Sequence, residues 1–139
     1  MTDLSQYQNV GTVANTDYYT APSDPDILLI IPRKDFVDTP QLARIAADFQ
    51  SDYARQLGKK CSTVVVMSNL LSQDAETRRI YSEMAGNGLF YASALVVDNA
   101  LSRALGSFFI GLSRPKVPLK LFDTPEKAIA WLKSIRPQS

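Results

Sequence analysis

The chain has 139 residues, of which 45% are hydrophobic and 21% are charged, the proportions of a soluble globular domain. Fifteen Lys and Arg against fourteen Asp and Glu give a net charge of +1, so no basic surface for nucleic acid is expected. The chain has no histidine, which excludes Ser-His-Asp catalysis, Cys-His catalysis and imidazole-ligated zinc within it.

The single cysteine and the short apolar stretches of the chain indicate in which cellular compartment the protein is expected. Cys61 cannot form an internal disulfide, which suits a reducing environment. The first ten residues lack the cationic start and the apolar core of a signal peptide. The longest nearly apolar stretch, residues 89–97, is much shorter than the ~18 residues that suggest a membrane-spanning helix. We therefore expect a cytoplasmic protein without a transmembrane segment.

The N-terminal part of the chain predicts a strand, a turn and a second strand. Residues 1–8 are expected to form a flexible lead-in to one domain that spans residues 9–136. Val, Thr and Tyr between positions 10 and 20 favour a strand, and the two prolines within 21–26 favour a turn. The apolar run 27–31 predicts a strand that is buried on both faces.

The next segment has the clearest helical periodicity in the chain. Thr39 or Asp38 can cap the start of this helix, Pro40 suits its first turn, and Gly58 closes it. The spacing of apolar residues predicts an inward face made of Leu42, Ile45, Ala46, Phe49, Tyr53 and Leu57. The residues expected to face water are Asp48, Ser51, Asp52 and Arg55.

Strands and helices alternate through the rest of the chain. Strands are predicted at 62–67 and 92–98, both buried, and at 118–122, which reads as an edge or half-buried strand. Helices are predicted at 74–85, 100–113 and 123–135, the last with Ala128, Ile129, Leu132, Trp131 and Ile135 turned inward. This order predicts a single α/β domain. Its mainly parallel sheet of four or five strands has an antiparallel N-terminal strand and is flanked by four helices.

Polar residues follow three of the predicted parallel strands. In open α/β sheets, ligands bind outside the carboxyl ends of the strands. This rule predicts a crevice for a ligand or partner, formed by Arg33, Ser68, Asn69, Asp98, Asn99 and Arg103. The alternative is that these are ordinary loop residues, with Asp98 or Asn99 capping the helix that follows. We expect no catalytic, cofactor-binding or metal-binding residues, and we interpret Cys61 as a structural thiol because no histidine can activate it.

The predicted helix 100–113 carries more apolar groups than one face can hold. Phe108, Phe109 and Ile110 are consecutive, so they cannot all face the same side. We therefore predict an interaction surface made of Phe109, Ile110, Arg114 and Lys116. Its expected occupant is a protein partner, a second copy of the chain in a homodimer, or a lipid. The alternative is that the N-terminal segment covers it.

Several motifs match a known bacterial family. They include Ser102–Arg103, Phe108–Phe109, Arg114–Pro115–Lys116, Lys120–Leu121–Phe122 and Trp131–Leu132, together with Ser72, Asp74, Glu76 and Arg78 at an earlier helix start. Over roughly residues 26–134 the chain resembles STAS-like, or SpoIIAA-like, domains. The resemblance implies a non-enzymatic regulatory module that binds a protein partner. The alternative function is to bind a small molecule or lipid in the strand-end crevice or in an internal apolar pocket.

The same resemblance bears on phosphorylation. In STAS domains a Ser or Thr after a central strand accepts the phosphate, and Glu76 aligns best with that position here. Glu76 either mimics a phosphate or is simply favoured by the dipole of the first helical turn. Ser72 is a nearby hydroxyl and a candidate phosphorylation site, with helix capping as the alternative.

Overall fold

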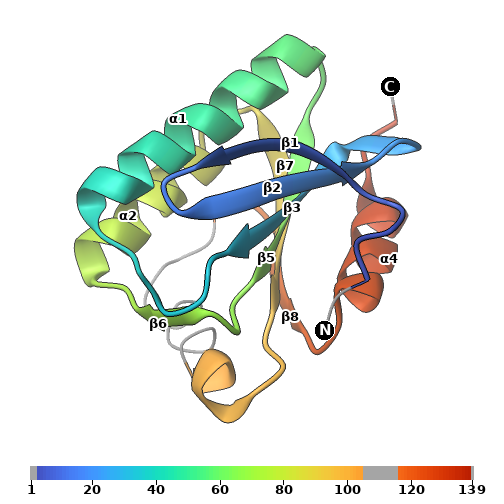
Figure 1. Ribbon diagram of the computed structural model, residues 1–139. Coiled ribbons are helices and arrows are strands. Elements are labelled where there is room, and N and C mark those ends of the chain that lie inside the picture. The colour runs from blue at the N-terminus through green and yellow to red at the C-terminus, as the bar shows by residue number, and fades with distance from the viewer. Residues whose placement is uncertain (1–2, 105–115, 139) are drawn as a thin grey trace.

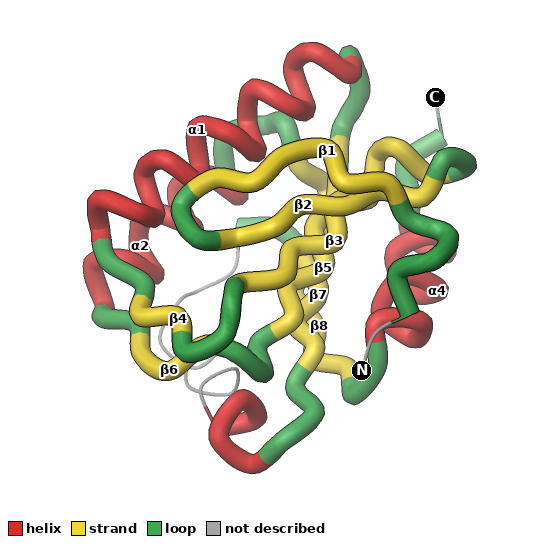
Figure 2. Tube along the Cα trace, viewed as in Figure 1, coloured by secondary structure: helices red, strands yellow, loops and turns green. Residues whose placement is uncertain are grey.

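The computed structural model describes residues 3–104 and 116–138, and its central feature is a mixed sheet of six strands in the order β1-β2-β3-β5-β7-β8. Strands β3, β5, β7 and β8 run parallel to one another, whereas β2 pairs antiparallel with both of its neighbours, β1 and β3. Figures 1 and 2 show β1 and β8 at opposite edges of the sheet. The strands are β1 (Gln8–Val13), β2 (Thr16–Ala21), β3 (Asp24–Pro32), β5 (Cys61–Val66), β7 (Phe90–Val96) and β8 (Leu119–Phe122). The α/β class and the mainly parallel sheet are therefore as predicted.

The first predicted strand is instead a hairpin. Residues 10–20 do not form one strand, because the chain reverses at Ala14 and Asn15 between β1 and β2. These two residues have φ angles of 51° and 57°, the positive values that a two-residue hairpin turn requires. Glycine is the residue that usually marks such a turn in a sequence, and this turn has none. Alanine rarely adopts a positive φ, so Ala14 gave no sign of it. The sheet consequently has six strands rather than four or five.

A second, two-stranded parallel sheet was not predicted. It pairs β4 (Phe36–Val37) with β6 (Leu70–Ser72). Phe36 and Leu70 are buried, whereas Val37 and Leu71 are 50% and 47% exposed. Strands of two and three residues are too short to show a hydrophobic period, so periodicity could not reveal them.

Helices cover both faces of the main sheet. In Figure 1, α1 and α2 lie on one side of the sheet and α4 lies on the other. The helices are α1 (Pro40–Leu57), α2 (Ala75–Ala85) and α4 (Pro125–Ile135). Thr39 caps α1 by accepting a hydrogen bond from the Leu42 N–H at 3.2 Å, and Gly58 ends it with a φ of 78°, as predicted. Residues 100–104 begin the remaining predicted helix, and its continuation lies outside the described residues.

The buried face of α1 differs from the predicted one. Ile45, expected to face inward, is 51% exposed, and Ser51, expected to face water, is only 6% exposed. The cause is α2, which packs along α1, so that Ile80 of α2 shares a cluster with alanines of α1. The Asn87 side-chain amide also donates a hydrogen bond to Ser51 Oγ at 3.2 Å. The buried residues of α1 are Ala43, Ala46, Ala47, Gln50, Ser51 and Ala54.

Two hydrophobic layers hold the sheet between its helices. Ala128 and Leu132 of α4 are fully buried and share a cluster with Leu29 and with neighbours on β5 and β7. On the other face, Leu28 packs in a cluster that includes Tyr18. The buried strands therefore carry apolar side chains on both faces, as predicted. Ile135, expected to face inward, is 39% exposed because it lies at the last position of α4. None of the described helices is long and apolar enough to cross a membrane.

Candidate functional site

Three of the six residues predicted to form the strand-end crevice do lie together. Ser68, Asn69 and Asp98 line one cavity of about 550 Å³ at the carboxyl ends of β3, β5 and β7. Its other wall is the start of α4, which contributes Asp123, Thr124, Pro125 and Glu126. The sequence analysis missed this wall. The same strand-end rule would have found it, because Asp123 directly follows β8.

The other three predicted residues are engaged elsewhere. Arg33 forms an ion pair with Asp17 at 3.4 Å and lines a separate surface pocket. Asn99 caps the helical turn 100–104, since its Oδ1 accepts a hydrogen bond from the Ser102 N–H at 2.8 Å. Arg103 donates to the Val97 carbonyl at 3.3 Å. For Asn99 the geometry therefore matches the capping alternative.

The strand-end cavity is acidic. Its described lining includes Asp98, Asp123 and Glu126 but no lysine or arginine. A hydrogen bond from Lys127 holds the pKa of Asp123 below its usual value, so this carboxyl is ionised at neutral pH. No three acidic or cysteine side chains in the described part of the chain converge as metal ligands. The described lining therefore contains no basic residue of its own, although Lys127 pairs with Asp123 at 3.0 Å, and no carboxylate cluster that could hold a metal ion.

A second, smaller cavity lies between the sheet and helices α1 and α2. It has a volume of about 100 Å³ and a mostly apolar wall. The described residues that line it are Thr16, Tyr18, Ile30, Pro32, Phe36, Asp38, Gln50, Thr63, Val65, Met67, Leu70, Gln73, Tyr81, Met84 and Leu95. The sequence analysis anticipated an internal apolar pocket but none of its residues.

The polar groups of this cavity centre on Asp38, which follows β4 and is 6% exposed. Its Oδ2 accepts hydrogen bonds from the Gln73 side-chain amide at 3.0 Å and from the Tyr81 hydroxyl at 2.9 Å. Its Oδ1 is buried and has no hydrogen-bond partner. Burial raises the pKa of Asp38, and the hydrogen bonds from Gln73 and Tyr81 only partly oppose this. A carboxyl group is therefore fixed in the cavity wall with one unused acceptor.

The comparisons with known proteins establish a family but no activity. Residues 24–136 match the model of a domain of unknown function, DUF7793. The chain belongs to this family. Among solved structures, the NMR structure of the protein TM1081 is similar, with a TM-score of 0.62 and 18% sequence identity over 96% of this chain and 98% of that chain. At that identity the likeness supports the fold alone. No curated protein matches the sequence.

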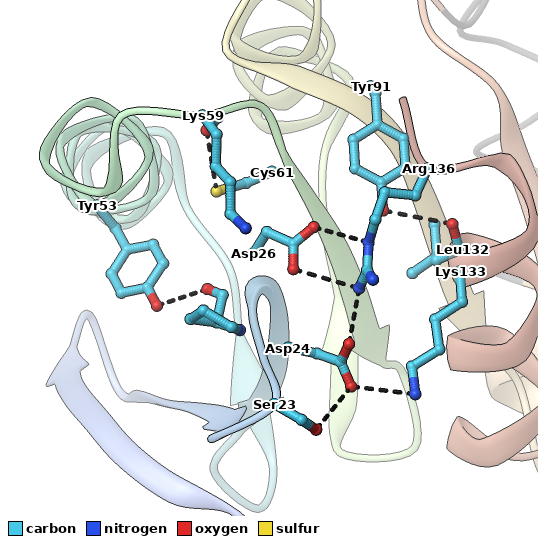
Figure 3. Close-up of polar contacts among 11 residues, drawn as sticks. Ser23, Asp24, Asp26, Tyr53, Lys59, Cys61, Tyr91, Leu132, Lys133 and Arg136 are labelled. Atoms are coloured by element: carbon cyan, nitrogen blue, oxygen red, sulfur yellow. Dashed lines mark hydrogen bonds and ion pairs between the residues drawn. The ribbon is translucent and has the colours of Figure 1, made fainter. Parts of the chain in front are cut away.

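The DUF7793 match begins and ends at two residues that pair with each other. Figure 3 shows Arg136, just after α4, between Asp24 and Asp26 at the start of β3. Its Nη2 donates to Asp24 Oδ1 at 2.8 Å and to Asp26 Oδ1 at 3.2 Å, and its Nε lies 3.0 Å from Asp26 Oδ2. Lys133 pairs with Asp24 at 3.1 Å. This network fastens the end of α4 to the sheet, so we assign it a structural role.

The start of α2 and the strand end just before it are largely exposed. Asp74 caps α2 by accepting a hydrogen bond from the Thr77 N–H at 2.8 Å, so the alternative that Ser72 caps this helix is wrong. Ser72 ends β6 and is exposed, which leaves it a candidate phosphorylation site. Glu76 lies 3.9 Å from both Arg44 and Arg79, in the first turn of α2.

The predicted interaction surface falls mostly outside the described residues. Phe109, Ile110 and Arg114 belong to the segment 105–115, which the structure does not describe. Lys116 is exposed, and its side chain lies over Gly86 at the end of α2. A Cβ at Gly86 would lie 2.5 Å from Lys116 Cδ, so glycine makes room for this crossing.

We expect Cys61 to be chemically inert in the folded protein. It is fully buried, and burial together with nearby Asp26 raises the pKa of its thiol to about 11, outweighing Lys59. At pH 8, its reaction with a chromogenic disulfide should be roughly a hundredfold slower in the native protein than in urea, since the thiolate is the nucleophile. Stopped-flow absorbance measures both rates. A native rate within tenfold of the unfolded rate would contradict this expectation.

Proposed function

We propose that the protein is a non-enzymatic binding module of the STAS-like type and that it recognises a protein partner. The observation that carries the proposal is the exposed part of the small sheet, formed by Val37, Leu71 and Ser72, which we call the β4–β6 face. Val37 and Leu71 are branched apolar side chains, 50% and 47% exposed, on paired strands. Exposed apolar residues grouped in this way are typical of protein contact surfaces.

The position of the β4–β6 face supports the same proposal. Leu71 and Ser72 lie a few residues before α2, whose first turn holds Glu76. By the resemblance to STAS domains, Glu76 aligns best with their phosphate-accepting residue. A partner that contacts Val37 and Leu71 would also meet any charge placed on Ser72 or Glu76. Phosphorylation of Ser72 would add about two negative charges beside this contact and so regulate it. The absence of histidine and the burial of Cys61 support a role that is not enzymatic.

Site-specific photo-crosslinking in the native host tests the proposal. A photoreactive phenylalanine analogue replaces Leu71 in one strain and Ile135 in a control strain. Ile135 is an exposed apolar residue on α4, on the opposite side of the sheet. We expect a discrete protein adduct from position 71 only. We also expect Val37→Lys in the same chain to abolish it, and the identified partner, once purified, to bind this variant at least tenfold more weakly.

Three outcomes would overturn the proposal. Equal adducts at positions 71 and 135, or none at either, would show that the β4–β6 face has no dedicated partner. An adduct with the mass of two copies of this chain would replace the partner protein with self-association.

A second candidate function is small-molecule binding, and the cavity at Asp38 favours it. A cavity of 150 Å³ lined by apolar residues holds benzene. The present cavity measures about 100 Å³ within the described residues, so it suits a smaller molecule and is too small for a fatty acyl chain. In this cavity a compact ligand is therefore favoured over the lipid that the sequence analysis also considered.

A further inference from the structure

We propose that the cavity beneath α1 and α2 binds a small organic cation, whose ammonium group pairs with Asp38 Oδ1 and whose short apolar body contacts Ile30, Val65 and Leu95. This inference names the ligand class for the candidate function of small-molecule binding and rests on it. It does not depend on the partner surface. Its basis is a carboxylate oxygen that is buried in the wall of a cavity and has no hydrogen-bond partner.

The hydrogen-bond donors around Asp38 favour its ionised form, but burial outweighs them and leaves its pKa raised. The two side-chain contacts on Oδ2, from Gln73 and Tyr81, are both hydrogen-bond donors, as an acceptor-only carboxylate requires. Burial opposes the charge, because a buried carboxylate without a counter-ion is costly in free energy. A ligand cation at Oδ1 would supply the missing hydrogen bond and the missing charge together.

The charges and rings around the cavity favour a cation over an anion. None of the described lining residues is a lysine or arginine. The nearby carboxylate of Asp74 adds negative potential at Asp38. Tyr18 and Tyr81 also line the cavity, and aromatic rings attract organic ammonium groups. An ionised Asp38 would repel an anionic ligand at this wall.

The size and polarity of the cavity limit the ligand further. By comparison with benzene in a 150 Å³ cavity, a volume of about 100 Å³ suits about four non-hydrogen atoms. Water can bond to the polar groups near Asp38, but the part of the wall formed by Ile30, Val65 and Leu95 offers an ordered water no hydrogen-bond partner. Isopropylammonium has the required size, charge and apolar body.

An NMR titration of the whole chain with three probes of equal size tests the proposal. The probes are isopropylammonium chloride, isopropanol and sodium acetate, which are cationic, neutral and anionic, added at constant ionic strength. We expect saturable amide shifts at Asp38, Gln73 and Tyr81 with isopropylammonium, at least tenfold weaker binding of isopropanol, and no saturable shifts at these residues with acetate. For a ligand this small, we expect a Kd in roughly the millimolar range.

Two variants locate the charge that the ligand recognises. Asp38→Asn should weaken isopropylammonium binding at least tenfold, because the amide is neutral. Asp98→Asn should leave binding unchanged, because Asp98 lines the strand-end cavity instead. If Asp38→Asn does not fold, the comparison of the three probes on the unmodified protein still decides the question.

The possible failures are distinguishable. Equal binding of isopropanol and isopropylammonium at Asp38 would overturn the cation class and leave small-molecule binding intact. No saturable shift at the cavity residues with any probe would overturn both. Ammonium shifts centred on Asp98 and Asp123 would place the cation in the strand-end cavity and overturn the assignment to Asp38. Crosslinking at the β4–β6 face would be unaffected in each case.

Discussion

Replacing Arg136 with methionine is expected to lower the free energy of unfolding by about 2–3 kcal/mol. The side chains of Asp24 and Asp26 are only 11% and 4% exposed, so the variant leaves two nearly buried carboxylates without this partner. Breaking a fully buried ion pair costs about 3–5 kcal/mol, and we expect a smaller effect because the Arg136 side chain is 33% exposed. Methionine keeps much of the aliphatic length. Urea denaturation at pH 7 measures the change.

The neighbouring cation provides a matched control. Lys133 contacts Asp24 at 3.1 Å, but its side chain is 49% exposed, so water screens the pair. Lys133→Met should therefore lower the free energy of unfolding by less than about 1 kcal/mol. If both variants were equally stable, Arg136 would not be the residue that fastens α4 to β3.

The same network predicts how the effect depends on pH. Burial acts to raise the pKa of Asp24, but hydrogen bonds from Arg136 and Lys133 outweigh it and hold this pKa below its usual value. A carboxyl group with a lowered native pKa stabilises the fold above its unfolded pKa of about 3.9, and this contribution is lost as the pH falls through the native pKa. The stability difference between wild type and Arg136→Met should therefore shrink between about pH 5 and pH 3. A difference that stays constant over this range would contradict the assignment.

The features of the fold that the sequence predicted depend on local chemistry. Thr39 and Gly58 bracket α1 as expected, because a cap needs only a hydroxyl before the helix and a residue that tolerates a positive φ after it. The apolar run 27–31 is buried on both faces for a similar reason, since a strand without a polar side requires helices above and below. Neither inference needs knowledge of which elements become neighbours.

The features that it did not predict depend on tertiary contacts. The helical period of α1 fixes an apolar stripe, but Ser51 is buried because α2 and Asn87 lie against it. Which helix packs beside α1 is not encoded in the period of α1. The N-terminal hairpin was missed for a different reason, because Ala14 adopts a positive φ that its residue type gives no cause to expect.

The two cavities show the same distinction. The strand-end rule correctly grouped Ser68, Asn69 and Asp98, because register alone brings the ends of parallel strands together. It could not show that Asn99 and Arg103 use their side chains on the local backbone. The cavity at Asp38 was beyond sequence reasoning, because the short pairing of β4 with β6 brings Asp38 close to Gln73, 35 positions further along the chain.

Replacing Leu132 with alanine is expected to lower the free energy of unfolding by about 3 kcal/mol. Leu132 is fully buried and packs in the cluster that joins α4 to β3, β5 and β7. Substitutions of buried leucine by alanine typically cost 2–5 kcal/mol, because apolar contacts are lost and the cavity left behind closes only partly. The Tyr91 hydroxyl donates to the Leu132 carbonyl at 3.4 Å, and the variant retains this backbone acceptor. The loss therefore reports side-chain packing.

Ile135→Ala on the same helix separates packing from helix propensity. Ile135 lies one turn further along α4 and is 39% exposed, so its truncation should cost less than about 1 kcal/mol. Urea denaturation of both variants gives the comparison, and similar losses would show that α4 is not anchored through Leu132. Hydrogen exchange provides a second measurement. Leu132→Ala weakens the docking of α4 on the sheet, so it should speed exchange at the amides of Lys127 and Ala128 in the first turn of the helix, next to the strand-end cavity. Ile135→Ala should leave that exchange unchanged, which distinguishes loss of docking of the whole helix from fraying of its end.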